Sequence, residues 1–520
     1  MSASDAELVE SDHVASLRAP LRTAWWNGRT LTLQLPASTS PVVIALDVDG
    51  AFFDEAVAGG DGTARFAFPF APAAHDSLVL LPRRGRDGEA LVAAPLTVRF
   101  GIPGFAAPHE PEPVTDAPPG TAMLAPATRD LAAVATTVVV PVFNAPELVR
   151  RCLDSVLAHS TGRTRLVVID DASTDAGIAP LLERYAGRPG IEVLRHPANR
   201  GFTATANRGI DAAGNDDVVL LNADTEVGPH WLAGLRRAAY AAHDIATATA
   251  VSDNAGAFSV PELEVANRWP DGWSFDDAAR ALWQDAGHAY PGLPTGNGFC
   301  MYVRRDALDR VGRLDESAFA QGYGEENDFC QRAAQAGFRH VVAGNVYVRH
   351  ARSSSFGDAR RAALGEQGMA VLRERYPDYE QEVGRALHAY ARRVLDWRVR
   401  RLFAVAGNPP TRRVLWLGTP SAGAAPRAWS VVERDAGMVL VDDAGRVRER
   451  GGSARSLALH DWLQRYGFDG AVIGNDPPVP DAAAIAARLL LPSAAGSGID
   501  PLAQLAVEGR ALASFPERVV

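Results

Sequence analysis

The chain has 520 residues, a formal net charge of −10 and an apolar fraction of 47%. It is too long for one hydrophobic core, so we expect several domains. The acidic balance argues against a nucleic-acid binder, which needs a basic face. The acidic N-terminus does not look like a secretory signal, and no apolar run approaches the ~20 residues of a membrane span. We therefore expect a cytoplasmic protein, either free or peripheral to a membrane, with its three cysteines as buried free thiols.

The first quarter of the chain predicts a tail, a small β domain and a linker. Residues 1–18 are polar without periodicity, which is typical of a disordered tail. Residues 19–103 contain short alternating strands and favour a β-sandwich accessory domain. The expected strands are 31–35, 42–48, 64–70, 77–81 and 91–100. Residues 104–131 are rich in Pro and Ala and predict a semi-stiff linker.

Two features of the β domain look like sites but have simpler interpretations. Asp47, Asp49 and Gly50 carry the letters of a DxD motif, but Asp-Gly is a hairpin-turn signal, and we interpret them as a turn. Trp25 and Trp26 are interpreted as core or interface residues rather than as a platform for sugar.

In residues 132–404, strands alternate with helical stretches such as 147–158 and 178–185, which predicts an α/β fold with a largely parallel sheet. Polar side chains follow one apolar strand after another, and ligands bind beyond the carboxyl ends of strands in such sheets. The stretches are Val138–Asn144, Leu166–Asp175, Asn199–Asn207 and Val218–Asp224. They predict one nucleotide-binding face.

The succession PVFN, DDASTD, NRGF and NAD, followed by GYGEENDF and His350, resembles the family 2 glycosyltransferases. The resemblance covers about 137–357 and implies a GT-A nucleotide-binding domain that uses a nucleotide-sugar donor. It implies donor contacts, with Asp170 on the base, from Pro141, Val142, Phe143, Asn144, Asp170, Asp171, Ser173, Asn199, Arg200, Gly201, Asn207, Asn222, Ala223 and Asp224.

Several of these residues also have an interpretation of their own. Ser173 or Asp175 could cap a helix. Arg200 could bind phosphate beside a helix N-terminus that faces the anion. Asn207 could be a surface amide.

The resemblance also implies a divalent cation, Mg²⁺ or Mn²⁺. Asp224 stands at the acidic position of a DxD-like motif and is the expected metal ligand, since hard cations prefer oxygen. Asn222 replaces the first acid and is expected to contact ribose or a metal-bound water. His350 matches a late family histidine and is the second expected ligand, although a lone histidine is often structural.

The catalytic acids are expected in GEEND. The family has Glu-Asp here, and its second acid is the general base, so Glu326 takes that role. Glu325 and Asp328 are expected to hold acceptor hydroxyls or to complement the dipole of the following helix.

The remaining segments leave alternatives open. The irregular stretch 253–293, with three tryptophans, is expected either to shape the acceptor site or to be packed down. Gly296 and Gly298 mark a ligand approach or a strand-entry turn. Residues 358–404 predict helices broken near Pro377, and the arginine-rich last one packs on the protein or lies on an anionic membrane.

Residues 405–520 predict a Rossmann-like module, partly resembling GT-B enzymes, with an accessory or assembly role. A phosphate-binding turn at 418–423 is one possibility within it.

Together these features predict an inverting hexosyl- or deoxyhexosyltransferase that acts in surface polysaccharide synthesis, such as O-antigen. The donor is a UDP-sugar or dTDP-rhamnose, and the acceptor is a glycan or lipid-linked glycan. Possible partners are the inner membrane surface and other polysaccharide-assembly enzymes. The alternatives are a sugar-nucleotidyltransferase, which would need a Gly-rich basic loop after its first strand, and a non-catalytic glycan-binding scaffold.

Overall fold

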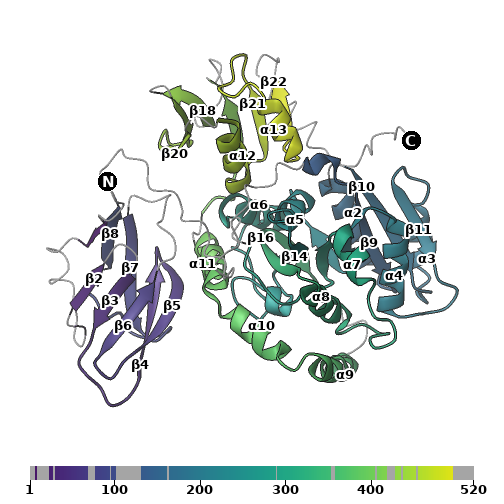
Figure 1. Ribbon diagram of the computed structural model, residues 1–520, viewed down its shortest axis with the longest axis horizontal. Helices are drawn as coiled ribbons and strands as arrows, with labels where there is room; N and C mark the ends of the chain where they lie inside the picture. The colour runs from purple at the N-terminus through teal and green to yellow at the C-terminus, as the bar shows by residue number, and fades with distance from the viewer. Residues whose placement is uncertain are drawn as a thin grey trace.

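The computed structural model describes 6–8, 21, 23–26, 30–67, 77–93, 95–100, 130–160, 163–287, 290–352, 358–404, 407–418, 428–434, 437–451 and 455–495 (Figure 1). The chain forms an N-terminal β unit, a central α/β domain and a C-terminal α/β module. Most of the predicted linker 104–131 lies outside these residues. Leu131–Ala133 forms the short 3-10 helix η1, and Leu131 packs into the core of the C-terminal module.

The N-terminal unit consists of two antiparallel sheets that share one core, as the sequence predicts. The five-stranded sheet has the order β1 (Ala6–Leu8), β8 (Leu96–Phe100), β7 (Ser77–Arg84), β4 (Val42–Val48), β5 (Ala51–Ala58). The three-stranded sheet has the order β2 (Thr23–Trp26), β3 (Thr30–Gln34), β6 (Thr63–Ala67).

Two expectations for this unit need correction. The tail is not wholly disordered, because Ala6–Leu8 pairs with β8. Strand β5 was not predicted, since its charged residues interrupt the apolar alternation. Asp49 and Gly50 lie in the β4–β5 turn with positive φ, so the turn interpretation of the DxD letters holds. The side chains of Trp25 and Trp26 lie outside the described set.

The central domain is built on an eight-stranded mixed sheet. Its order is β11 (Ile191–Arg195), β10 (Thr164–Asp170), β9 (Thr136–Val142), β12 (Asp217–Leu221), β15 (Cys300–Val303), β14 (Ile245–Ser252), β16 (Arg339–His350), β13 (Thr225–Val227). The first four strands are parallel, and β15 and β13 run antiparallel to their neighbours. The carboxyl ends of β9, β10 and β12 therefore meet at one edge.

Helices cover both faces of this sheet, with a separate apolar core on each. One face packs against α2 (Pro146–His159), α3 (Ile178–Glu183), α5 (Trp231–Ala239) and α6 (Phe275–Asp285). The other packs against α4 (Phe202–Ala213), α7 (Arg305–Val311) and α8 (Glu325–Gln335). The three cysteines are buried free thiols, as expected.

The stretch 253–293 is less irregular than predicted, because it contains η2 (Gly256–Phe258) and the helix α6. A capping box between Ser274 and Asp277 starts α6, and this pattern was readable in the sequence. The tryptophans are packed down: the indole N–H of Trp283 donates to the Phe468 carbonyl, and that of Trp273 to the Gly407 carbonyl. They form no exposed sugar platform.

Three helices, α9 (Asp358–Arg375), α10 (Tyr379–Leu387) and α11 (Tyr390–Ala404), follow the sheet. Figure 1 shows α11 between the N-terminal sheets and the central domain. Buried Arg392 donates to the carbonyls of Ala257 and Ser259, and Arg393 pairs with Asp54.

These contacts support the packing interpretation of the arginine-rich helix and count against the membrane alternative. Arg398 and Arg400 also bond within the protein. None of the helices in the described ranges combines the length and apolar character of a bilayer span.

The C-terminal module has a six-stranded sheet, again as predicted from its α/β pattern. The order is β20 (Val447–Gly451), β19 (Gly437–Val441), β18 (Trp429–Arg434), β17 (Val414–Leu417), β21 (Gly470–Ile473), β22 (Ser493–Ala495). Helices α12 (Arg455–Arg465) and α13 (Ala482–Arg488) pack on it. The possible phosphate turn lies outside the described residues beyond Gly418.

Candidate functional site

The loops that follow β9 and β10 are tied to each other at the carboxyl edge of the sheet. The Asn144 backbone N–H donates to Ser173 Oγ at 2.8 Å. Asn144 Oδ1 in turn accepts from the backbone N–H groups of Thr174 and Asp175 at 2.8 and 2.9 Å. Asn144 and Ser173 thus use these atoms to shape the rim. Asp175 Oδ1 accepts from the N–H of Gly177, which precedes α3, at 2.8 Å, so Asp175 does bond the start of this helix.

Five non-glycine residues around this edge have positive φ, a conformation that costs free energy. They are Asn144, Ala145, Ala172, Tyr323 and Arg352. Such strain persists where the surrounding structure fixes it, and it often accompanies a ligand site.

Asp170 ends β10 with its side chain buried. Its Oδ1 accepts from the Ser173 N–H at 2.8 Å, and its Oδ2 lies 3.2 Å from Arg195 Nε. The Arg195 side chain is 58% exposed. Asp170 therefore sits rigidly at the edge where the sequence predicts a nucleobase contact.

Asp171 was expected to contact the donor, but its carboxylate is bonded within the protein. Its two carboxylate oxygens accept from the backbone N–H groups of Arg200 and Gly201, at 2.8 and 2.9 Å. The Asp171 carboxylate is thus the anion that bonds these N–H groups at the start of α4. It occupies the position where the sequence predicted a phosphate, so that prediction is corrected. The Asn199 side chain donates to the Asp171 carbonyl, which ties the same loop together.

Asn207 is also a structural residue. The sequence predicted either a donor contact or a surface amide, and the side chain is instead buried and bonded within the protein. It is 2% exposed, its Oδ1 accepts from the Leu314 N–H, and its Nδ2 donates to the Leu314 carbonyl and to Glu316 Oε1. It joins α4 to the segment that leads into α8. Arg200 is 57% exposed and lies 3.7 Å from Glu316, so its side chain remains near the edge.

The two predicted metal ligands do lie together. Asp224 Oδ1 is 3.4 Å from His350 Nε2, although the residues are far apart in sequence. Antiparallel pairing of β13 with β16 sets Thr225 opposite His350 and so creates this approach. The Asn222 backbone is fixed by its N–H, which donates to the Phe299 carbonyl.

The contacts of His350 define its tautomer. Its Nδ1 is 3.0 Å from the Asn254 carbonyl, which can only accept, so Nδ1 carries a proton. Its ring stacks on Phe299, and its backbone N–H donates to Asp253 Oδ1. In the neutral ring the Nε2 lone pair then points toward a carboxylate. This arrangement fits a cation between the two, and the carbonyl contact is typical of the groups that orient metal-binding histidines.

Asp253, Asn254 and Phe299 were not predicted as part of the site. No motif in the sequence marks them. They act on His350 through the Asp253 carboxylate, the Asn254 carbonyl and the Phe299 ring. Within the described ranges, no group of three or more His, Cys, Asp or Glu side chains could hold a metal ion. The chain would therefore supply two ligands to a cation at this position.

Glu325 and Glu326 form a carboxyl pair at the start of α8. Glu325 is 3% exposed, and its Oε2 accepts from the Gly324 N–H at 3.1 Å. Burial, and then the neighbouring Glu326, raise the pKa of Glu325 well above its ordinary value. Glu326 is half-buried, and its Oε2 is a buried oxygen with no hydrogen-bond partner.

Asp328 belongs to the framework, which corrects its predicted place among the catalytic acids. Its side chain is fully buried, with Oδ2 2.8 Å from Arg332 and Oδ1 2.7 Å from Arg375. The Tyr376 hydroxyl donates to the same Oδ1 at 2.9 Å. These bonds fasten α8 to α9 and leave no room for an acceptor hydroxyl.

Gly296 and Gly298 belong to a strand-entry turn. The Asn297 side chain accepts from the Phe299 N–H, and a Cβ at Gly296 would lie 2.2 Å from Met301 Sδ. A side chain at position 296 would have to displace Met301, so close packing explains a glycine here.

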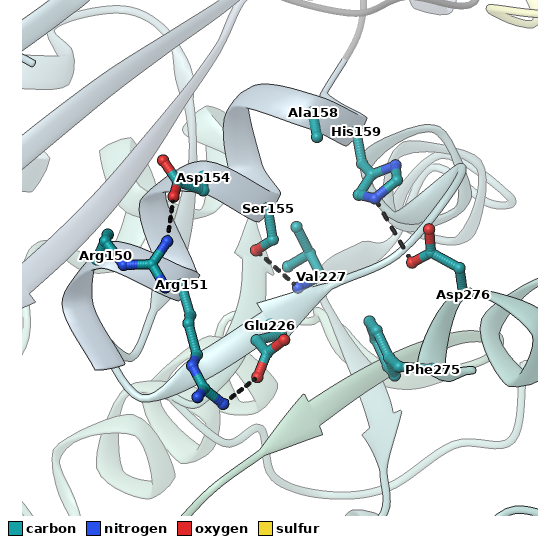
Figure 2. Close-up of a pocket in the computed structure, with 10 residues that line it drawn as sticks. All are labelled: Arg150, Arg151, Asp154, Ser155, Ala158, His159, Glu226, Val227, Phe275 and Asp276. Atoms are coloured by element: carbon teal, nitrogen blue, oxygen red, sulfur yellow. Dashed lines mark hydrogen bonds and ion pairs between the residues drawn. The ribbon is translucent and has the colours of Figure 1, made fainter. Parts of the chain in front are cut away.

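A separate pocket of about 320 Å³ lies between α2, β13 and the start of α6 (Figure 2). Its charged side chains already pair with one another, as with Arg150–Asp154 at 2.8 Å and His159–Asp276 at 3.6 Å. Glu226 also pairs with Arg349 at 2.9 Å. None of the predicted site residues lines this pocket.

A comparison with protein families matches the part of the chain that forms this edge of the sheet. Residues 137–312 match the model of glycosyl transferase family 2. This region is therefore similar to that family, and the eight-stranded mixed sheet with its flanking helices is the α/β arrangement that the sequence resemblance implies.

Several curated proteins are similar in sequence to part of this chain. "Uncharacterized glycosyltransferase YibD" of Escherichia coli is 33% identical over 94 residues, 18% of this chain and 27% of the relative. "O-antigen biosynthesis protein RfbC" of Myxococcus xanthus is 29% identical over 266 residues, 50% of this chain and 19% of the relative. "Pre-mycofactocin glycosyltransferase" of Mycobacterium tuberculosis is 29% identical over 251 residues, 46% and 48% of the two chains. In each case less than half of the relative's own length is aligned.

Solved structures are similar over part of the chain. The mannosyltransferase PcManGT of Pyrobaculum calidifontis, in complex with GDP-Man and Mn²⁺, is 19% identical, covering 54% of this chain and 78% of that one, with a TM-score of 0.36. GalNAc-T7 with UDP, GalNAc and Mn²⁺ is 17% identical, covering 42% and 44%, with a TM-score of 0.34.

Proposed function

We propose that the protein is an inverting, cation-dependent glycosyltransferase that moves a sugar from a nucleoside-diphosphate donor to a hydroxyl of a glycan. The approach of Asp224 to His350 at one end of the sheet carries the proposal. The family match over residues 137–312 supports it. The nucleotidyltransferase alternative lacks support, since the loop after β9 holds Asn144 and Ala145 instead of a basic glycine-rich turn.

The donor nucleotide binds along the carboxyl edge. Asp170 accepts the N3–H of a uracil or thymine, because its carboxylate is held at the end of β10 by Ser173. The backbone from Pro141 to Phe143 brackets the base. Exposed Arg200 faces the diphosphate through its guanidinium, which suits phosphate oxygens.

Asp224 and His350 would hold a Mg²⁺ or Mn²⁺ ion. The 3.4 Å between Asp224 Oδ1 and His350 Nε2 would let one small cation contact both atoms. Sites for these ions commonly use one or two protein groups and complete their coordination with substrate phosphate and water. When bound, the ion would neutralise charge on the departing diphosphate.

Glu326 is the general base. The acceptor O–H proton passes to the Glu326 carboxylate while the acceptor oxygen bonds to the anomeric carbon. The bond from that carbon to the diphosphate oxygen breaks, and the nucleoside diphosphate leaves with the electron pair. Glu326 Oε2 lacks a donor, and rotation of this half-buried side chain offers it to the acceptor hydroxyl.

A surface polysaccharide is the proposed product. The names of the aligned relatives support this, among them an O-antigen protein and "Succinoglycan biosynthesis protein ExoO" of Rhizobium meliloti, which is 32% identical over 96 residues.

A binding screen tests the donor class. Nucleotide sugars with uridine, thymidine, guanosine or adenosine are each added with Mn²⁺, and the thermal midpoint is measured. We expect a pyrimidine nucleotide to raise the midpoint of the wild type and not that of Asp170→Asn, because binding to the native state alone stabilises it. Equal shifts in both proteins would contradict the role of Asp170, and no shift with any nucleotide would contradict the proposed function.

A further inference from the structure

Two consecutive residues hold His350, and both lie in the loop that follows β14. The His350 backbone N–H donates to Asp253 Oδ1 at 2.9 Å, and its ring Nδ1 lies 3.0 Å from the Asn254 carbonyl. Strand β14 ends at Ser252, and its pairing with β16 ends there too, so the sheet does not fix these two residues. The orientation of the imidazole therefore depends on what holds the loop.

Asn267 closes this loop. Its backbone N–H donates to the Asp253 carbonyl at 2.8 Å. Its side chain bonds both backbone polar groups of Glu262: Oδ1 accepts from the N–H at 3.1 Å, and Nδ2 donates to the carbonyl at 2.8 Å. Nδ2 also donates to the Val265 carbonyl at 3.2 Å. Because the Glu262 N–H can only donate, the amide oxygen must face it, and the amide nitrogen is left to face the carbonyls.

The other end of the loop is anchored to two further parts of the chain. Glu262 Oε1 lies 2.7 Å from Arg86 Nη2 in the N-terminal unit and 2.6 Å from Arg400 Nε on α11. The two guanidinium groups also lie over the Phe52 ring of β5, with Cζ 4.3 and 5.1 Å from its centre. The loop that holds His350 is therefore fixed to α11 and to the N-terminal unit.

We propose that Asn267 is a positioning residue for the cation site. It holds residues 253 and 254 where they keep His350 in the tautomer whose Nε2 lone pair faces Asp224. The inference rests on the proposed function, because the proposed cation is what requires that lone pair. It assigns residues 253–267 a role in the cation site, distinct from shaping an acceptor site.

Nitrogen NMR of the full chain tests the orientation without metal or substrate. Protein labelled with ¹⁵N-histidine is measured at about pH 8, where an ordinary imidazole is neutral, and His350→Gln assigns the His350 signals. We expect only the Nδ1–H tautomer in the wild type. In Asn267→Asp the new carboxylate cannot donate to the Glu262 carbonyl, so we expect a mixture with the Nε2–H tautomer.

A matched control separates the loop from the added charge. Asn475→Asp makes the same substitution at an exposed position of the C-terminal module and should leave the His350 tautomer unchanged. The signals of the other histidines report in each variant whether the protein remains folded.

Mn²⁺ alone, titrated into the same samples, tests the consequence for the cation. A bound paramagnetic ion broadens the signals of the ring that it contacts, so the Mn²⁺ concentration at half-broadening of His350 reports the affinity. Groups that orient a metal-binding histidine typically change metal affinity by about 10- to 100-fold. Asn267 acts through the loop rather than by direct contact, so we expect the low end, about a 10-fold higher concentration in Asn267→Asp.

The outcomes separate the inference from the function on which it rests. If Asn267→Asp keeps the wild-type tautomer and the wild-type response to Mn²⁺, Asn267 is not a positioning residue and the cation site stands. If Mn²⁺ leaves His350 sharp in the wild type, the proposed cation site is wrong, and the tautomers alone decide whether Asn267 orients His350. Should Asn267→Asp fail to fold, Asn267→Ala removes the side-chain bonds, keeps the backbone N–H and carries the same comparison.

Discussion

Single residues at the edge of the sheet divide into those that face a ligand and those that hold the loops. Asp224 and His350 are proposed for the first group because they approach each other, and Asp170 because its Oδ2 pairs with an exposed arginine rather than with backbone. Asp171 and Asn207 belong to the second, because their polar atoms are bonded within the protein. Motif letters alone do not make this distinction, since both groups are polar residues after strands.

Glu326→Gln removes the proposed base with little change of shape. General-base catalysis typically contributes about 10²–10⁴-fold, so kcat should fall by about that factor. The Kd of the donor should not change, because the proposed contacts of the nucleotide and its cation are Asp170 and Asp224. Steady-state kinetics and calorimetric titration measure the two quantities, and an unchanged kcat would place the base elsewhere.

Asp328→Asn should affect stability rather than chemistry. The buried carboxylate pairs with Arg332 and Arg375, and breaking a buried pair is costly. Both arginines are partly exposed, so we expect the low end of the range, about 3 kcal/mol of unfolding free energy. Urea denaturation measures it, with exposed Asp306→Asn as the comparison. If Asp328→Asn has the urea midpoint of the wild type but no turnover, Asp328 is a catalytic acid after all.

At the scale of elements, helix α11 connects parts of the chain that the sequence suggests are independent. Trp397 is 2% exposed, lies in the core of the N-terminal unit, and donates its indole N–H to the Val48 carbonyl. On the other side of the helix, the Arg392 guanidinium donates hydrogen bonds to the backbone carbonyls of Ala257 and Ser259. Isolated residues 130–404 would expose Trp397 to water, so the two Pro-rich boundaries do not define free modules.

Trp397→Ala should therefore destabilise the full chain. Truncating a buried Trp to Ala typically costs about 3–5 kcal/mol. Thermal unfolding should show one earlier transition that includes both the β unit and the central domain. Exposed Leu457→Ala is the control. An early transition limited to the β unit, with the central domain unchanged, would show that α11 does not join them.

The sequence was informative wherever apolar periodicity was unbroken. Strands 414–417 and 470–473 and the helix at 147–158 were located to within a residue, because buried segments must repeat apolar side chains. Helix α6 was missed because its apolar face is short and lies among loops. The partners of Asn207, about 107 residues away, could not be seen, since hydrogen bonds across the fold leave no local pattern.

At the scale of the whole molecule, the C-terminal module is docked through a buried polar cluster. Asp469 lies 3.0 Å from His230 and 3.2 Å from Arg280, and it accepts from Gln284 and the Arg413 N–H. Its side chain is 7% exposed. Figure 1 shows the module above α5 and α6, which carry the partners in the central domain.

This docking should weaken in acid. Hydrogen bonding and charge from His230, followed by the Arg413 N–H, lower the pKa of Asp469 against the opposing effect of burial. A carboxyl with a lowered folded-state pKa stabilises the native state above its unfolded value of 3.8, and the contribution is lost as pH falls below it. Asp469→Asn should lower the thermal midpoint at pH 7, and by a smaller margin at pH 3, where part of the contribution has already been lost. Equal losses at both values would show that the charge is not responsible.

The cation dependence of turnover tests the central claim most directly. Release of nucleoside diphosphate with donor and acceptor is measured after EDTA treatment, and again after Mg²⁺ or Mn²⁺ is returned. Because the proposed site offers a cation two protein ligands, Asp224 and His350, we expect no turnover in chelator, recovery with either ion in the wild type, and none in Asp224→Asn. Full turnover in EDTA, or wild-type recovery in Asp224→Asn, would contradict the assignment of this edge of the sheet as a cation-dependent glycosyltransferase site.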